Sequence, residues 1–154
     1  MDEPLTTLID RLDSKSCSQQ EDAWIAIRSR GVVLIPEFKS AYARFKKSEG
    51  RAALVFYATS FARVSEDAFD LGRFALKDPS KLVRDRACGL LAYSLRADAV
   101  GPLTETVNDP ALSVRQSAEA ALLAIRTKNH HLFVDPTRSG KIFWVVNPQD
   151  KLQA

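Results

Sequence analysis

Apolar residues recur at intervals of three and four positions through two long stretches of the chain. One stretch contains Val83, Ala87, Leu90, Leu91 and Leu95, and the other contains Val114, Ala118, Ala121, Leu122 and Ile125. This spacing places the side chains on one side of an α-helix. The pattern therefore predicts amphipathic helices, each of which buries its apolar side against a neighbour.

The two stretches are copies of one unit, shifted by a constant 31 residues. The matching positions are Asp78 and Asp109, Pro79 and Pro110, Val83 and Val114, and Arg84 and Arg115. Proline has no N–H and disfavours helical geometry in the residue before it, so a helix should end at each Asp-Pro step. A second helix should follow, because proline is compatible with a first helical turn. Each copy therefore predicts two helices joined by an Asp-Pro turn.

This unit resembles the repeat of the HEAT-like family in its short bacterial form, over about residues 68–126. That family places an Asp-Pro turn between two antiparallel helices and a Val-Arg pair early in the second helix. The resemblance implies an all-α fold, a right-handed α-α solenoid of about four HEAT-like helix pairs in one domain. The expected units are a degenerate N-terminal pair at 1–31, a degenerate repeat at 32–65, clear repeats at 66–97 and 98–127, and a C-terminal hairpin and tail at 128–154.

The resemblance also implies roles for individual residues. The family lines its concave face with the second helix of each pair. The candidate partner-binding residues on that face are Arg28, Arg51, Arg86, Tyr93 and Glu119. The turn aspartates and the repeat arginines should form a structural ladder between neighbouring repeats. The members of this ladder are Asp78, Arg84, Asp109 and Arg115.

The period of the pattern changes after Arg126. Residues 132–134 and 141–146 are rich in β-branched and aromatic side chains, and the turn-forming segment DPTRSG lies between them. We therefore expect a C-terminal β-hairpin, with Gly140 at a positive φ. A hairpin alone is marginal in water, so this one must pack against something. It either covers the flank of the last helix pair or offers Phe143 or Trp144 to a partner.

The composition is that of an ordinary globular domain. The chain has 154 residues, of which 45% are hydrophobic and 27% charged. Two distant cysteines, Cys17 and Cys88, make no disulfide framework and favour a reducing compartment. The acidic N-terminus differs from a signal peptide, and the longest apolar run is too short to span a bilayer. We therefore expect a cytoplasmic protein with no membrane partner.

No combination of residues predicts catalysis, and we expect no enzyme activity, cofactor, metal or small-molecule substrate. His130 and His131 are adjacent, so on a strand they would point to opposite faces and chelate a metal poorly. No Cys-x-x-Cys or His-x-x-x-His spacing accompanies them. Cys88 lies on the apolar side of its expected helix, which is typical of a small buried side chain.

Charge is unevenly distributed along the chain, although the net charge is only +3. Residues 1–31 contain six acids and four bases, whereas residues 32–65 contain two acids and six bases. The expected solenoid would present an extended surface to macromolecules, which favours a protein-binding module. The resemblance suggests an adaptor or a bacterial immunity protein that caps a toxin. A toxin that acts on nucleic acid would be basic at its active site, so the acidic face would then bind it. The alternative is nucleic-acid binding through a basic concave surface. An accessory role in cofactor chemistry, as in the similar phycobilin-lyase proteins, has the weakest support.

Overall fold

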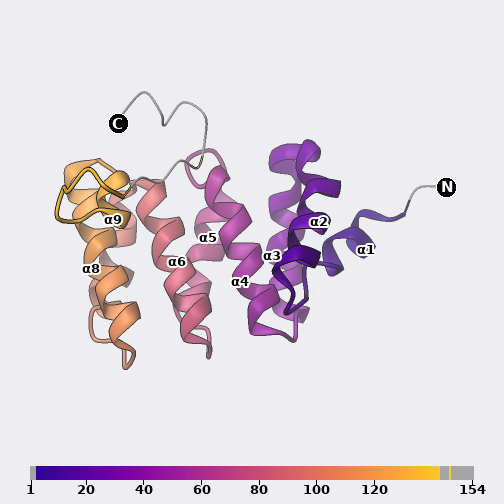
Figure 1. The fold of residues 1–154 in the computed structure, drawn as a ribbon, viewed down its shortest axis with the longest axis horizontal. Helices are drawn as coiled ribbons and strands as arrows, with labels where there is room; N and C mark the ends of the chain where they lie inside the picture. The colour runs from indigo at the N-terminus through magenta and orange to yellow at the C-terminus, as the bar shows by residue number, and fades with distance from the viewer. Residues whose placement is uncertain (1–2, 143–145, 147–154) are drawn as a thin grey trace.

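The computed structural model describes residues 3–142 and 146, and this part of the chain contains helices and turns but no strand (Figure 1). The expected all-α class is therefore correct. The α-helices are α1 (Leu5–Asp10), α2 (Cys17–Ile27), α3 (Leu34–Arg44), α4 (Ser48–Ala58), α5 (Glu66–Ala75), α6 (Lys81–Ser94), α7 (Val100–Thr106), α8 (Leu112–Thr127) and α9 (His131–Val134). Short 3-10 helices occur at η1 (Arg28–Val33), η2 (Thr59–Phe61) and η3 (Ala97–Ala99).

The helices form two layers along the length of the molecule. Helices α4, α6 and α8 lie side by side in one layer, and α2 continues that layer at the N-terminal end (Figure 1). In the other layer α1 packs on α3 and α3 on α5, while α7 packs against α8. Helix α6 is central, because every residue from Ala87 to Ser94 is buried. One continuous apolar core runs between the layers from Ile9 to Ile125.

Local chemistry fixes where the helices begin and end. The Ser16 hydroxyl accepts a hydrogen bond from the Gln19 N–H at the start of α2, as an N-cap does. Ser65 caps α5 in the same way, with Ala68 as the donor. Helix α5 ends before the Asp-Pro turn, and α6 begins two residues after Pro79. The sequence signals therefore place this helix pair where the repeat pattern predicts it.

The predicted C-terminal β-hairpin is wrong. Residues 132–134, expected as its first strand, belong to the short helix α9, which packs on α8. Helix α8 ends at Thr127, and the next residue, Lys128, takes a left-handed conformation. The Asn129 side chain then accepts a hydrogen bond from the His131 N–H. Packing against α8 outweighs the β-propensity of the sequence LFV. Residues 141 and 142 are not in a strand either, and the rest of the expected second strand is not fully described.

The expected turn at DPTRSG is present, although no strands flank it. The Asp135 carboxylate accepts hydrogen bonds from the Ser139 hydroxyl and N–H and from the Gly140 N–H. Gly140 has φ of +74°, the conformation expected for it. The Ser139 hydroxyl and the Gly140 N–H hold the pKa of the Asp135 carboxyl below its usual range. This turn therefore closes on its own aspartate rather than on a strand ladder.

Candidate functional site

The expected partner-binding residues lie in different environments. Arg28, Arg86 and Glu119 are exposed, on η1, α6 and α8 respectively. Arg51 is half-buried and points its guanidinium at the turn between α5 and α6. Tyr93 is fully buried in α6. Three of the five residues therefore have side chains on the surface, whereas Arg51 and Tyr93 face the interior of the molecule.

Tyr93 belongs to an aromatic and basic cluster at the junction of α6 and α9. The guanidinium of Arg63 lies 4.0 Å from the centre of its ring, and the Arg63 Nε donates to the Tyr93 carbonyl at 2.8 Å. His130 approaches the same ring edge-on, with ring centres 4.8 Å apart. A cation above an aromatic ring is an attractive contact. The cluster therefore connects the end of α6 to the segment that leads into α9.

His130 and His131 are both buried in this junction, with their rings 4.1 Å apart. The Nη2 of Arg63 lies 2.9 Å from the Nδ1 of His130. Arginine has only donors, so in this contact Nδ1 of His130 is the acceptor. Within residues 3–142 and 146, no group of three His, Cys, Asp or Glu side chains is placed to hold a metal ion. Both histidine rings are buried in contact with each other, and His130 also contacts Tyr93.

Asp78 is the centre of a buried hydrogen-bond network. Its carboxylate accepts from the Arg51 Nε at 2.8 Å and Nη2 at 3.2 Å, and from the Tyr42 hydroxyl at 2.5 Å. The Ser80 N–H completes the set at 2.8 Å. Burial alone would raise the pKa of Asp78, but these donors outweigh it and hold the pKa below its ordinary value. Burial and the charge of Asp78 in turn raise the pKa of the Tyr42 hydroxyl.

Asp109 repeats this arrangement one unit further along the chain. Its carboxylate accepts from the Arg84 Nε at 2.8 Å and Nη2 at 3.1 Å, and from the Ala111 N–H at 2.9 Å. The Arg84 Nη1 also donates to the Asp78 carbonyl at 2.8 Å, and the Arg115 Nη1 donates to the Asp109 carbonyl at 2.8 Å. Arg84 and Arg115 therefore each donate to a carbonyl in the turn of their own helix pair. Arg84 also binds the aspartate of the next pair, Asp109.

Arg51 is the residue whose placement differs most from its expected role. It pairs with Asp78 across 27 residues, as Arg84 pairs with Asp109 across 25 residues. Arg51 therefore binds the aspartate of the following Asp-Pro turn in the same way as Arg84 does. Its alignment with Arg84 and Arg115 in sequence carried this information, because each of these arginines lies near the start of the second helix of its pair.

Most charged groups of α1, α3, α5 and the neighbouring turns are paired with one another, and Glu37 on α3 forms no ion pair with a residue that the structure describes. We call the outward side of α1, α3, α5 and α7 the odd-helix face. Its ion pairs are Arg44 with Asp10, Lys39 with Asp67 and Asp70, Arg73 with Asp70, and Arg96 with Glu66 and Asp98. These contacts join successive helices of this layer. The charges of the odd-helix face therefore largely neutralise each other locally.

The opposite side of the molecule has a different character. We call the outward side of α2, α4, α6 and α8 the even-helix face. Glu21, Glu49, Arg86 and Glu119 lie there, and none of them forms an ion pair with a residue that the structure describes. Phe56 on α4 is also 50% exposed on this face. Uncommitted charges and an exposed aromatic ring thus occur together here.

Two hollows lie on the even-helix face. One, of about 300 Å³, crosses α4 between α2 and α6 and is lined by Phe56, Leu82 and Arg86 among others. The second, of about 680 Å³, lies between α6 and α8 and includes Asp85 and Glu119. The Ser117 hydroxyl donates to Asp85 across this second hollow. Phe56 and Leu82 were not among the residues predicted from the sequence, because their only signal there is an apolar side chain at a surface position of a helix.

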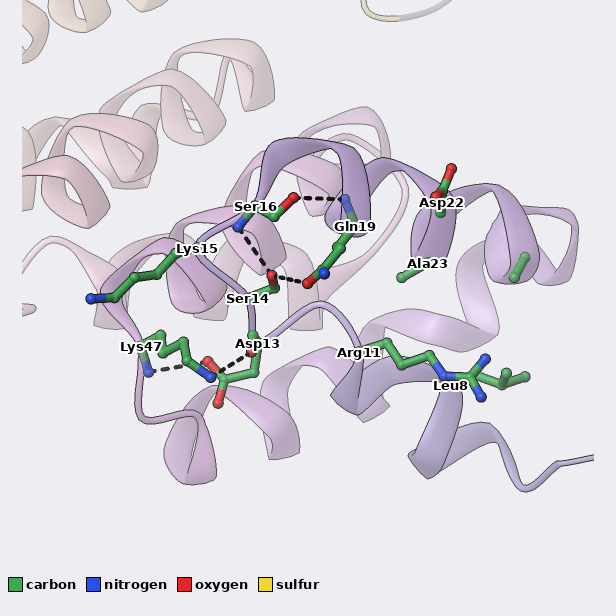
Figure 2. Close-up of a pocket in the computed structure, with 11 residues that line it drawn as sticks. Leu8, Arg11, Asp13, Ser14, Lys15, Ser16, Gln19, Asp22, Ala23 and Lys47 are labelled. Carbon is green, nitrogen blue, oxygen red and sulfur yellow. Dashed lines mark hydrogen bonds between the residues drawn. The ribbon is translucent and has the colours of Figure 1, made fainter.

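A third hollow, of about 680 Å³, lies at the N-terminal end between α1 and α2 (Figure 2). Figure 2 shows Ser14 and Ser16 hydrogen-bonded to Gln19, and Lys47 donating to the Asp13 carbonyl. The Asp13 carboxylate accepts from the N–H groups of residues 46 and 47, which anchors the start of α4. The polar groups of this hollow are therefore largely committed to holding α1, α2 and α4 together.

Two expected contact residues, Phe143 and Trp144, lie outside the described residues. Among the helices that the structure does describe, none is both long enough and apolar enough to cross a membrane. Comparison of the chain with protein-family models, curated proteins and solved structures finds no match.

Proposed function

We propose that the chain is a non-enzymatic protein-binding module that uses its even-helix face. The observation that carries the proposal is the contrast between the two faces. Most charges of the odd-helix face are paired within that face, whereas the even-helix face presents Phe56, Leu82 and charges without an ion-pair partner among the described residues beside a hollow. Exposed apolar groups rimmed by charges are typical of protein interaction sites.

The likeness of the unit to HEAT-like repeats, supported by the two matching Arg-Asp pairs, agrees with this function. Within it we favour an adaptor or a bacterial immunity protein, which would work by covering the active site of its partner. Glu21 and Glu49 on the even-helix face are compatible with a basic partner surface, as a nuclease-like toxin would have. The immunity role rests on the resemblance and on the size of the chain.

The alternative to protein binding is that the chain binds nucleic acid through the basic segment at residues 32–65. Three of its six bases, Lys39, Arg44 and Arg51, are held by carboxylates. A base that is already paired within the protein releases fewer counterions from a nucleic acid. The ion pairs therefore weigh against this alternative.

The test is a pull-down of the tagged chain from lysate of its source organism near physiological salt, with half of the sample treated with nuclease. We expect a stoichiometric protein that survives nuclease. The matched variants are Phe56→Ser on the even-helix face and Phe74→Ser on the odd-helix face, because the two rings are 50% and 53% exposed. The partner should be lost with Phe56→Ser and retained with Phe74→Ser. Bound material that leaves with nuclease or added salt would instead support nucleic-acid binding and contradict the proposal.

A further inference from the structure

The hollow that crosses α4 has a floor of small side chains. Ala52 and Ala53 lie at its base and are only 4% and 5% exposed. Alanine ends at its Cβ atom, so another chain laid across these residues can approach the α4 backbone closely. The volume of about 300 Å³ is at the lower end of the range for binding clefts. We call this hollow the α4 cleft, and its size suits a few large side chains rather than a whole small-molecule cofactor.

One end of the α4 cleft is aromatic and held in place. The Tyr57 ring stacks on Trp24 with ring centres 4.5 Å apart, and Phe56 meets Tyr57 edge-on at 5.3 Å. Phe56 is half-exposed and Leu82 is 37% exposed across the cleft. A ring fixed by stacking loses little side-chain freedom when a partner covers it. This end is therefore suited to receive an apolar side chain.

The two walls of the α4 cleft carry opposite charges. Glu21 on α2 and Glu49 on α4 lie on one side, with Lys15 at the turn before α2. Arg86 on α6 lies on the other side, with its guanidinium 5.6 Å from the centre of the Phe56 ring. Opposite charges on facing walls select an occupant whose two flanks have the reverse charges, in a defined orientation.

The walls also indicate the backbone conformation of the occupant. Helices α2, α4 and α6 use their own backbone groups internally, so the cleft supplies no sheet edge to pair with an extended strand. A helix satisfies its backbone hydrogen bonds by itself and offers an apolar stripe at spacings of three and four residues. An amphipathic helix therefore fits the cleft, because it needs no backbone hydrogen bonds from it and can place an apolar stripe on its apolar residues.

We propose that the α4 cleft binds an amphipathic helix of the partner protein. The apolar stripe of that helix covers Phe56, Leu82 and the alanine floor, a basic flank faces Glu21 and Glu49, and an acidic flank faces Arg86. This inference rests on the proposed protein-binding function and adds the site and the kind of segment that it takes.

The experiment selects binders for the full chain from a phage-displayed library of helix-forming peptides about five turns long. We expect peptides with an apolar stripe, bases on one flank and acids on the other. Ala53→Trp fills the floor and should weaken them by about 30-fold or more, the loss that a hot-spot contact carries. Selection on Arg86→Glu should exchange the acidic flank for a basic one. Ala120→Trp, which fills the hollow between α6 and α8, is the matched control and should leave binding unchanged.

Circular dichroism and the melting temperature verify that each variant is folded, and Arg86→Glu carries the test if Ala53→Trp is not. Three results would overturn the proposal: no enriched peptide, peptides without opposite flanks, or binding that Ala53→Trp and Arg86→Glu leave unchanged. A protein captured from lysate whose binding ignores both variants would leave the module function standing and remove the α4 cleft from it. Nuclease-sensitive material alone would remove the module function itself.

Discussion

Asp78 and Asp109 are charged groups held inside the molecule by arginines. The side chain of Asp78 is 2% exposed and that of its partner Arg51 is 16% exposed. Both groups lost hydration on folding, so each depends on the other for compensation. Arg44 and Asp10 also form an ion pair of arginine with aspartate, but both side chains are exposed. Water solvates each of them, so neither depends on its partner for stabilisation. Burial, rather than the presence of an ion pair, therefore decides which aspartate matters for stability.

Replacing Asp78 by alanine should lower the free energy of unfolding by about 3 to 5 kcal/mol, because it leaves the Arg51 charge buried without its partner. Asp10→Ala removes an aspartate from an exposed pair and should cost at most about 1 kcal/mol. Urea unfolding at neutral pH measures both changes. Equal effects of the two substitutions would show that the buried pair has no special role.

The same aspartates predict an acid limit to stability. The pKa values of Asp78 and Asp109 are lowered in the folded chain, because their donors outweigh the effect of burial. Their contribution is therefore fully present above the ordinary aspartate pKa of about 3.9 and is lost as the pH falls through the lower folded-state values. Urea unfolding from pH 6 down to about pH 2 should show this decline. In Asp78→Asn the decline should be shallower, and an unchanged slope would contradict the assignment.

The residue pattern predicted some of these positions better than others. The offset of 31 residues identified the Asp and Arg positions of the two clear repeats. The family resemblance placed Arg51 and Tyr93 on a binding surface, because the position of a residue in the second helix of a pair does not tell whether a neighbouring side chain already covers it. The guanidinium of Arg63 and the ring of His130, both distant in sequence, cover Tyr93. Contacts of this range have no periodic signal.

At the scale of elements, the start of α4 is packed directly on the turn between α1 and α2. A Cβ atom added at Gly50 would lie 2.7 Å from the Asp13 Cα, a backbone atom that has no freedom to rotate away. Gly101 on α7 has no atom within 4 Å of the same position. The two helical glycines therefore differ in their surroundings, although both lower helix propensity in the same way.

Gly50→Ala should destabilise the chain by about 1 to 3 kcal/mol, because α4 must shift away from the α1–α2 turn. Gly101→Ala should change its stability by less than about 1 kcal/mol, because the added Cβ atom meets no neighbour beyond the adjacent residues, and Pro102, which disfavours helical geometry in a residue before it that has a Cβ, offsets the helix propensity of alanine. Thermal unfolding of the two variants gives the sign of each change. A stabilising Gly50→Ala would mean that α4 does not pack on the turn as closely as described.

The error at α9 also belongs to this scale. Residues 132–134 have a strand-like composition, and three residues are too few for periodicity to distinguish a helix from a strand. Leu132 is buried, and α9 packs on α8. The side chain of Phe133 lies beside Gly89 of α6, where a Cβ atom would come within 3.3 Å of the ring. The contacts of residues 132–134 with α6 and α8 thus determine that this segment is helical, because it is too short for its own sequence pattern to decide between helix and strand.

At the scale of the whole molecule, the two layers differ in how the charges on their outward faces are paired. Ion pairs along the odd-helix face join successive helices, and the ladder of buried pairs joins successive turns. The even-helix face has charged side chains without an ion-pair partner among the described residues, and the ring of Phe56 is half-exposed there. The repeated apolar pattern predicted the helices. It could not predict which charged side chains form ion pairs, because the partners lie about 30 residues apart and meet only when the helices pack into layers.

The layered arrangement predicts that stability is graded along the molecule. Helix α6 packs against α4, α5 and α8 and is buried without interruption from Ala87 to Ser94, whereas α1 packs against α2 and α3 and buries only Ile9 among its own residues. Amides of α6 should therefore exchange with solvent only on global unfolding, and those of α1 by local opening.

Hydrogen exchange followed by mass spectrometry distinguishes these regimes, with α1 exchanging several orders of magnitude faster than α6. Asp109→Asn weakens the contact between α6 and the turn before α8, so it should accelerate exchange in α7 and α8 more than in α4. Asp10→Ala, at the other end of the molecule, is the control and should leave α7 and α8 unchanged. Exchange at one common rate in α1, α6 and α8 would mean that the chain opens as a single unit. In that case the ladder would stabilise the whole fold rather than each junction between neighbouring helix pairs.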